Sequence, residues 1–266
     1  MPRLTVPRLT VPAPLLARLA ALDSCACSDA MDQLGLAGVA DGLRGMTVAR
    51  RVTGPVITVR LGPVAGDDAA SGGQHGIGQH GIGQHGIGQH GIGQHGGSSS
   101  PRPGRHLGTA AIAAARPGDV IVVAAGGRTD AAGWGGILSL AAVTRQVGGV
   151  IVDGACRDVD ESTELGLPVY ARAATPRTAR GRQAELAWDV PVLMAGISVD
   201  PGDLVIADGS GVVFLPAGRA AEIITAAERI AARETAMAMR IRAGEPSAQV
   251  MSADYENLLA VKPDPP

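Results

Sequence analysis

Apolar runs alternate with segments of helical periodicity along most of the chain. The apolar runs predict buried strands at residues 54–61, 119–127, 150–154 and 167–172, and two strands around a turn at 203–216. The helical patterns predict helices at 14–22, 28–35, 107–119, 134–149, 158–166 and 217–241, the second capped by Ser28 and stopped by Gly35. Strands that alternate with helices in this way predict an α/β fold whose sites lie at the carboxyl ends of strands.

Residues 62–104 interrupt this pattern. The segment is rich in glycine and carries the repeat QHGIG, which holds five of the six histidines of the chain. A five-residue step turns a helix by about 500°, so successive histidines would not share a face. Two glycines in each repeat also make ordering costly in entropy. We therefore predict that residues 12–250 form one domain and that residues 62–104 are a disordered insertion within it. We also predict flexible tails at 1–11 and 252–266.

Composition narrows the possible partners. Of 266 residues, 45% are hydrophobic, 18% are charged and 2% are aromatic, and the net charge is −2. This balance argues against nucleic acid and membrane surfaces, which attract a basic excess, and no apolar run has the length of a bilayer span. The cysteines Cys25, Cys27 and Cys156 form no disulfide framework or zinc pattern. We expect a cytoplasmic protein in which Cys25 and Cys27 are small packing residues.

The first candidate for chemistry is the glycine-rich stretch GGRTDAAGWGGILS, expected as a loop between a strand and a helix. The helix would begin at Gly135, Gly136, Ile137 and Leu138. Free N–H groups at its N-terminus would form an amide cradle for the carboxylate or phosphate of a substrate. The spacing fits neither of the common nucleotide-binding glycine motifs. The alternative is that the glycines only permit tight packing.

The second candidate follows the strand at 150–154, in the sequence GACRDVDE. Arg157 carries a permanently charged guanidinium group, whose planar set of donors suits a carboxylate or an enolate oxygen. Asp158 carries a carboxylate, an oxygen ligand that suits Mg²⁺ or Mn²⁺. Beside the amide cradle, this pair could hold a small 2-oxo acid. The alternative is a helix cap, because Asp158 and Glu161 form the D-x-x-E pattern of a capping box, with Arg157 as a surface residue.

The chain resembles the RraA-like family, which includes 4-hydroxy-4-methyl-2-oxoglutarate and 4-carboxy-4-hydroxy-2-oxoadipate aldolases. The segments that carry the resemblance are SDAMDQLG, VTGPVITVR, AIAAARPGDVIVV, GWGGILSLAAVTRQVGGVIVDGACRDVDESTELGLPVYAR and VDPGDLVIADGSGVVFLP. The resemblance implies a compact swivelling β/β/α domain that assembles as a homotrimer or hexamer with sites between subunits. It also implies Mg²⁺- or Mn²⁺-dependent retro-aldol cleavage of 4-hydroxy-2-oxo diacids to pyruvate, or decarboxylation of oxaloacetate, through an enolate.

The resemblance also assigns roles by position. It makes Asp158 the metal-binding acid, Arg157 the clamp for carboxylate and enolate, and residues 135–138 the substrate-binding cradle. Glu234, on the long C-terminal helix, would reach the metal of the neighbouring subunit. Asp153 would either support the site or simply end its strand.

One position departs from the family's pattern. The aldolases carry an acid 21 residues before the arginine of the Arg-Asp pair, and this chain has Gly136 there. The nearest upstream acid is Asp130, six residues too early. Some relatives are regulators that bind a ribonuclease, so a non-catalytic regulator with a protein partner is the alternative function.

Overall fold

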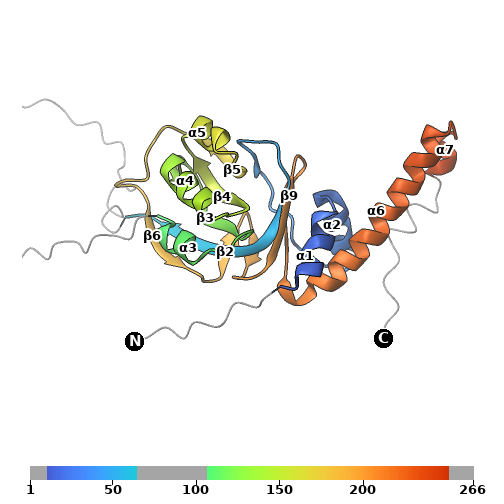
Figure 1. Ribbon diagram of the computed structural model, residues 1–266, viewed down its shortest axis with the longest axis horizontal. Coiled ribbons are helices and arrows are strands. Elements are labelled where there is room, and N and C mark those ends of the chain that lie inside the picture. The colour runs from blue at the N-terminus through green and yellow to red at the C-terminus, as the bar shows by residue number, and fades with distance from the viewer. Residues whose placement is uncertain (1–10, 65–106, 252–266) are drawn as a thin grey trace, which may run out of the picture.

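The computed structural model describes residues 11–64 and 107–251, which form a mixed α/β structure (Figure 1). The predicted α/β class is therefore confirmed. A strand ends at Gly62, so the first residue of the insertion predicted at 62–104 was placed wrongly. From residue 65 on, that prediction lies outside the described ranges, as does the prediction of flexible tails apart from residue 11. Within those ranges, none of the helices combines the length and apolar character of a membrane span.

An eight-stranded sheet organises the chain. Its strands are β1 (Arg44–Gly45), β2 (Val52–Gly62), β3 (Val120–Trp134), β4 (Gly149–Cys156), β5 (Val169–Ala174), β6 (Ala184–Trp188), β9 (Leu204–Asp208) and β10 (Gly211–Leu215). The order is β1-β5-β4-β3-β2-β9-β10, and β6 pairs with the end of β2. Strands β2 to β5 are parallel neighbours, whereas β1, β6, β9 and β10 join by antiparallel pairing. A separate hairpin contains β7 (Val192–Met194) and β8 (Ile197–Val199).

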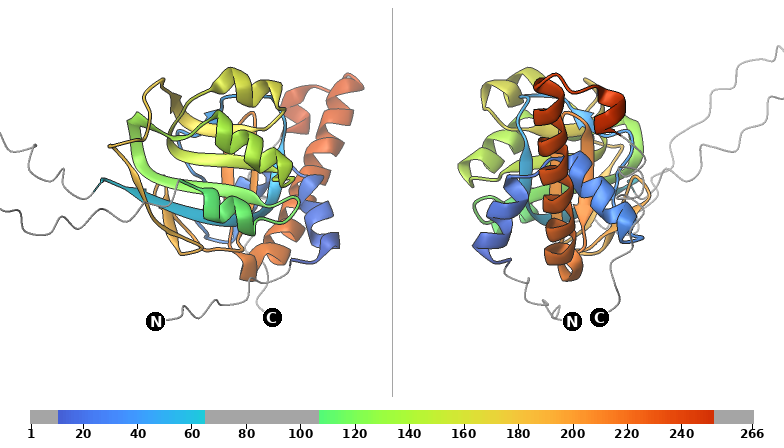
Figure 2. Two further views of the ribbon diagram at one scale, coloured as in Figure 1. Left: turned by 60° about the vertical axis from the view of Figure 1, so that its left-hand side comes forward. Right: turned by 90° about the vertical axis from the view of Figure 1, so that its right-hand side faces the viewer.

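The helices form two groups. The parallel strands are connected by α3 (Thr109–Ala114), α4 (Gly136–Thr144) and α5 (Val159–Glu164). The other group contains α1 (Ala13–Ala20), α2 (Ser24–Gln33), the 3₁₀ turn η1 (Ala217–Arg219), the long helix α6 (Ala220–Arg242) and α7 (Ser247–Val250). Figures 1 and 2 show α1, α2 and α6 together at the end of the molecule opposite α4 and α5. Arg18 of α1 pairs with Glu228 of α6 at 2.7 Å and helps to join these helices.

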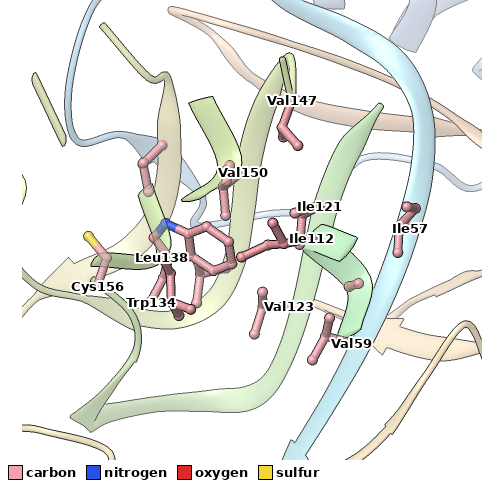
Figure 3. Packing of buried hydrophobic residues seen from close by; sticks show 14 of the residues in the cluster. Ile57, Val59, Ile112, Ile121, Val123, Trp134, Leu138, Val147, Val150 and Cys156 are labelled. Atoms are coloured by element: carbon pink, nitrogen blue, oxygen red, sulfur yellow. The ribbon is translucent and has the colours of Figure 1, made fainter. Parts of the chain in front are cut away.

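Side chains of β4 alternate between two hydrophobic clusters, as expected for a strand covered on both faces. Val150 lies in a cluster with Trp134 and Leu138, between the parallel strands and helices α3 and α4 (Figure 3). Ile151 points the other way, into a cluster shared with β9, β10 and the β7–β8 hairpin. A third cluster lies between β9–β10 and helices α1, α2 and α6. The layers are therefore helices, parallel strands, antiparallel strands and helices.

The glycine-rich stretch after residue 125 is not the predicted loop. β3 continues through it to Trp134 and pairs with β4 through three register shifts. Gly126 and Gly127 have φ values of +64° and +75°, a region that glycine adopts without steric cost, and they fall within these irregularities. β4 likewise runs to Cys156, so Asp153 lies inside its strand and the expectation that it ends the strand is wrong.

Helix α2 begins four residues before the predicted start. Asp23, not Ser28, is its N-cap, and the Asp23 carboxylate accepts a hydrogen bond from the Ala26 N–H at 2.8 Å. The N–H and hydroxyl of Ser24 donate to Asp208 of β9, which ties this helix start to the sheet. The pattern also missed the short elements β1, β6, β7, β8 and α7.

The cysteines divide by burial. Cys25 is exposed, whereas Cys27 and Cys156 are buried, so the packing role is confirmed for Cys27 and wrong for Cys25. Burial raises the pKa of the Cys27 thiol to about 12, and the carboxylates of Asp23 and Asp208 add to this rise. Burial raises the pKa of the Cys156 thiol to about 11. Both buried thiols therefore stay protonated near neutral pH.

Candidate functional site

The N-terminus of α4 and the end of β4 lie side by side. β3 and β4 are parallel neighbours, with Trp134 opposite Cys156, and the Arg157 N–H donates to the Trp134 carbonyl at 3.0 Å. Each strand then leads into a helix, β3 into α4 and β4 into α5. The topology therefore brings the predicted cradle at residues 135–138 next to Arg157 and Asp158.

The Asp158 carboxylate bridges these two segments. Its Oδ2 atom accepts a hydrogen bond from the Gly136 N–H at 2.9 Å and lies 3.2 Å from Arg157 Nε. Asp158 occupies the N-cap position of α5 with a left-handed φ of 53°, but its side chain makes no capping bond to that helix. The predicted capping box with Glu161 is therefore wrong. Asp158 caps α4 instead, where a negative charge is favourable.

The amide cradle is only partly used by Asp158. The first N–H groups of a helix have no acceptor inside it. Gly136 is satisfied by Asp158, whereas the N–H groups of Ile137 and Leu138 donate to no acceptor among the described residues. The Ile137 side chain is 77% exposed, while that of Leu138 is buried in the core (Figure 3).

Gly135 and Gly136 make room for this contact. A Cβ atom on Gly135 would lie 2.9 Å from Asp158 Oδ2 and 3.1 Å from Arg157 Nε. A Cβ atom on Gly136 would lie 3.1 Å from Asp158 Cβ. The Gly135 backbone is extended, with φ −163°, so close approach and not backbone conformation is the reason for glycine there. Tight packing therefore accounts for both glycines, and the use of the cradle for a substrate stays a prediction.

A buried chain of hydroxyl groups, which no sequence pattern indicated, fixes α4 against α5. Trp134 Nε1 donates to Ser139 Oγ at 2.9 Å, and Ser139 Oγ lies 2.8 Å from Ser162 Oγ. Ser162 Oγ donates in turn to the Asp158 carbonyl at 3.0 Å. The chain ends on the backbone of the proposed metal ligand, so it holds Asp158 in place relative to α4.

Two hollows flank Asp158 and Glu161. The first, of about 430 Å³, is lined by Gly136, Ile137, Leu140, Asp158, Glu161, Glu164 and Leu165. The second, of about 350 Å³, is lined by Arg157, Asp158, Val159, Asp160, Glu161, Ala174, Thr175 and Pro176. Each volume is in the range of small-molecule sites. The linings contain four carboxylates and, in Arg157, one basic group.

Two other acids considered in the sequence lie outside these hollows. Glu234 is on α6, and burial raises the pKa of its carboxyl group, with Asp23 and Asp29 adding to this rise. Glu234 is therefore next to α2 and is not brought to Asp158 within one chain. Asp130 is on β3 and pairs with Arg128 at 2.9 Å, and this hydrogen-bonded partner lowers the pKa of its carboxyl group.

Asp153 has a structural partner set of its own. Its side chain is 6% exposed and pairs with Arg172 of β5. Its second oxygen accepts a hydrogen bond from the Ala195 N–H, in the β7–β8 turn, at 3.1 Å. Asp153 thus connects β4, β5 and the hairpin, and it lines neither hollow.

A divalent cation is the cofactor that the resemblance implies for Asp158. No three His, Cys, Asp or Glu side chains gather as a metal-binding group among the described residues, so those residues offer no closed zinc-type site. Mg²⁺ needs fewer protein ligands, because it keeps several waters and uses one or two carboxylates with oxygen atoms of the substrate. Asp158 Oδ1 accepts no hydrogen bond from the described residues, so this oxygen atom is available as a ligand for such a cation. The donor set fits Mg²⁺ or Mn²⁺.

Comparison with known sequences identifies relatives of the chain. The profile of the RraA-like family, described as Aldolase/RraA, matches residues 24–214. A 4-hydroxy-4-methyl-2-oxoglutarate aldolase of Thermus thermophilus is 38% identical over 100 residues, which are 37% of this chain and 60% of the aldolase. The chain therefore spans less than two thirds of the length of that relative.

Solved structures extend the comparison to most of the chain. A protein of Pseudomonas syringae matches with a TM-score of 0.71 and 25% identity over 92% of this chain and 100% of that one. Streptomyces coelicolor RraAS2, described as an unusual member of the RNase ES inhibitor RraA protein family, matches with a TM-score of 0.69 and 25% identity. That match covers 88% of this chain and 100% of RraAS2. The predicted type of fold is confirmed.

Proposed function

Because the chain belongs to the RraA-like family, we propose that it is a divalent-metal-dependent lyase that acts on small 2-oxo acids. The reaction would be retro-aldol cleavage of a 4-hydroxy-2-oxo diacid to pyruvate, decarboxylation of oxaloacetate, or both, through an enolate. The observation that carries the proposal is the meeting of Arg157, Asp158 and the N-terminus of α4. The name of the Thermus thermophilus relative supports the aldolase activity.

Arg157 and α4 supply the positive charge that an enolate needs. The Arg157 side chain is 39% exposed and lines the second hollow, where its fork can donate two parallel hydrogen bonds to a substrate carboxylate. The N–H groups of Ile137 and Leu138, together with the helix dipole, favour an oxyanion in front of α4. These donors stabilise the negative charge that moves to the C2 oxygen when the C3–C4 bond breaks.

Asp158 is the residue that would hold Mg²⁺ or Mn²⁺. A bound cation would polarise the 2-oxo group as a Lewis acid. Asp158 Oδ1 accepts no hydrogen bond from the described residues, so this atom could hold the cation while Oδ2 keeps its contacts with the Gly136 N–H and Arg157 Nε.

The charge of the two hollows is the physical reason to expect a cation. Their linings contain four carboxylates against the single guanidinium group of Arg157. A substrate with one or two carboxylates is repelled by such a surface. A divalent cation at Asp158 offsets part of that repulsion, so we expect substrate capture as well as bond cleavage to depend on it.

The proposed site lies between subunits of a homotrimer or hexamer. Ile137 and Leu140 of α4 are 77% and 50% exposed at the rim of the first hollow, which gives an apolar surface that a neighbouring subunit would cover. Because Glu234 lies on α6, away from Asp158 of its own chain, any contribution it makes to the cation comes from a neighbouring subunit.

A second candidate function is a non-catalytic regulator that binds a protein partner such as a ribonuclease. The observation that favours it is Gly136, which supplies no acidic side chain at the position where the aldolases carry one. Streptomyces coelicolor RraAS2 is described as an unusual member of the RNase ES inhibitor RraA protein family, and this description supports the alternative.

Pyruvate release distinguishes the two functions. The purified full chain is incubated with oxaloacetate or a 4-hydroxy-2-oxo diacid, with Mg²⁺ or after treatment with EDTA, and pyruvate is measured. We expect turnover that EDTA abolishes, Mg²⁺ restores and Arg157→Ala lowers by at least about 100-fold, because a charge-stabilising donor is lost. If no metal-dependent turnover occurs on any of these substrates, the lyase proposal is wrong and the regulator is favoured.

A further inference from the structure

Glu161 has no role in the mechanism described above, although it stands at the centre of the site. It lies in the first turn of α5, is exposed, and lines both hollows together with Asp158. Its Cβ atom lies 3.5 Å from the position that a Cβ on Gly136 would occupy. The Glu161 side chain therefore starts beside the first residue of α4, where residue 136 provides no side chain. It forms no hydrogen bond or ion pair with any described residue.

The proposed retro-aldol reaction needs a group that takes up a proton and returns it. Arg157 cannot do this, because a guanidinium group keeps its protons in proteins. Asp158 is already engaged as the proposed cation ligand. Of the other two acids in the linings, Asp160 borders only the second hollow and Glu164 only the first. Glu161 is the remaining acid, and it borders both.

We infer that Glu161 is the proton carrier of the proposed lyase, an inference that rests on the proposed function. In retro-aldol cleavage, its carboxylate takes the proton of the C4 hydroxyl group while the C3–C4 bond breaks. The electron pair of that bond forms the enolate, and C4 becomes a carbonyl carbon. The carboxyl group then gives the same proton to C3, which forms pyruvate and restores the carboxylate. No proton is gained or lost, and no further reactant is needed.

Decarboxylation of oxaloacetate makes a different demand on this residue. Its substrate has no C4 hydroxyl group, so no proton has to be removed when CO₂ leaves and the enolate forms. Water can then protonate C3. Loss of Glu161 should therefore separate the two reactions, whereas loss of Arg157 should slow both of them, because both pass through an enolate.

The test compares Glu161→Gln with the unmodified full chain in Mg²⁺. We expect retro-aldol turnover to fall about 100- to 10,000-fold, the usual contribution of general acid–base catalysis, while oxaloacetate decarboxylation falls less than about tenfold. Exchange of the pyruvate methyl protons with D₂O, followed by NMR, should be lost in the same variant. Mn²⁺ affinity, measured by calorimetry, should stay within about threefold, because Glu161 is not assigned to the metal. Asp130→Asn, which removes an acid outside the hollows, is the control and should keep both reactions.

Each other outcome decides against the inference. Retained retro-aldol turnover and proton exchange in Glu161→Gln would show that another group carries the proton. An equal loss of both reactions, or a collapse of Mn²⁺ affinity, would assign Glu161 to the enolate or the cation instead. If the unmodified chain cleaves neither substrate, the proposed function itself fails and the inference falls with it.

Discussion

Ser139→Ala is the sharpest test of how α4 is fixed against α5. Ser139 is fully buried, and its hydroxyl group accepts the Trp134 Nε1–H and meets Ser162. Alanine removes that acceptor and leaves the indole N–H unpaired beneath the surface, because Trp134 is only 2% exposed. An unpaired buried donor costs about 1–3 kcal/mol, and the lost contact with Ser162 adds about 1 kcal/mol. We therefore expect the free energy of unfolding to fall by about 2–4 kcal/mol.

Urea unfolding and thermal unfolding at one fixed protein concentration measure this loss. For a folded region of about 200 residues, it corresponds to a decrease in Tm of about 5–12 °C. Thr144→Ala is the matched control, because its hydroxyl group bonds the Leu140 carbonyl on the exposed side of the same helix, and we expect a change within about 0.5 kcal/mol. Equal Tm values for Ser139→Ala and the control would refute the role given to the buried hydroxyl chain.

Three further predictions concern parts of the chain outside the proposed site. Arg172→Met should lower the free energy of unfolding by about 2–3 kcal/mol in urea titrations, because it leaves the buried Asp153 carboxylate without its guanidinium partner. The control Arg128→Ala, which removes an exposed ion pair, should change the free energy of unfolding by less than about 0.5 kcal/mol. Ellman's reagent at pH 8 should react with one thiol per native chain, that of Cys25, and with three after denaturation. The reason is that Cys27 and Cys156 are buried and have raised pKa values. Three fast-reacting thiols in the native chain would contradict this. Deletion of residues 72–100 should leave the number of subunits, measured by size-exclusion chromatography with light scattering, and any activity unchanged, and loss of the oligomer would show that this segment takes part in assembly.

The pattern of apolar and polar residues was sufficient to predict the main strands and helices. The parallel strands are buried on both faces, so they appear in the sequence as continuous apolar runs, and the apolar residues of the long helix α6 recur with helical periodicity. The short strands β1, β6, β7 and β8 have two to five residues each, too few to show a period. β1 and β6 form by pairing with strands that are distant in sequence, which no local pattern contains, whereas β7 and β8 pair with each other in a short hairpin.

Errors at element boundaries have the same non-local cause. Asp23 and Ser28 are both residue types that favour the N-cap position. The helix begins after Asp23 because the N–H and hydroxyl groups of Ser24 donate hydrogen bonds to Asp208 of β9. The glycines after residue 125 suggested a loop, but β4 offers a pairing edge along the whole stretch, so the strand continues with irregularities.

The candidate site could be located from the sequence but not assembled from it. Strand ends, glycines and the Arg157–Asp158 pair indicated the correct segments. The sequence could not reveal that Asp158 caps a helix 22 residues upstream, or that Ser139 and Ser162 meet across 23 residues. Both contacts depend on β3 and β4 being neighbours, which is a property of the whole sheet.

A crystal structure with Mg²⁺ and oxalate, a planar mimic of the pyruvate enolate, tests the central claim most directly. We predict that Asp158 Oδ1 binds the cation, and that oxalate oxygens lie within hydrogen-bond distance of Arg157 and the N–H groups of Ile137 and Leu138. A structure at saturating Mg²⁺ and oxalate with neither cation nor oxalate beside Asp158 would contradict the account.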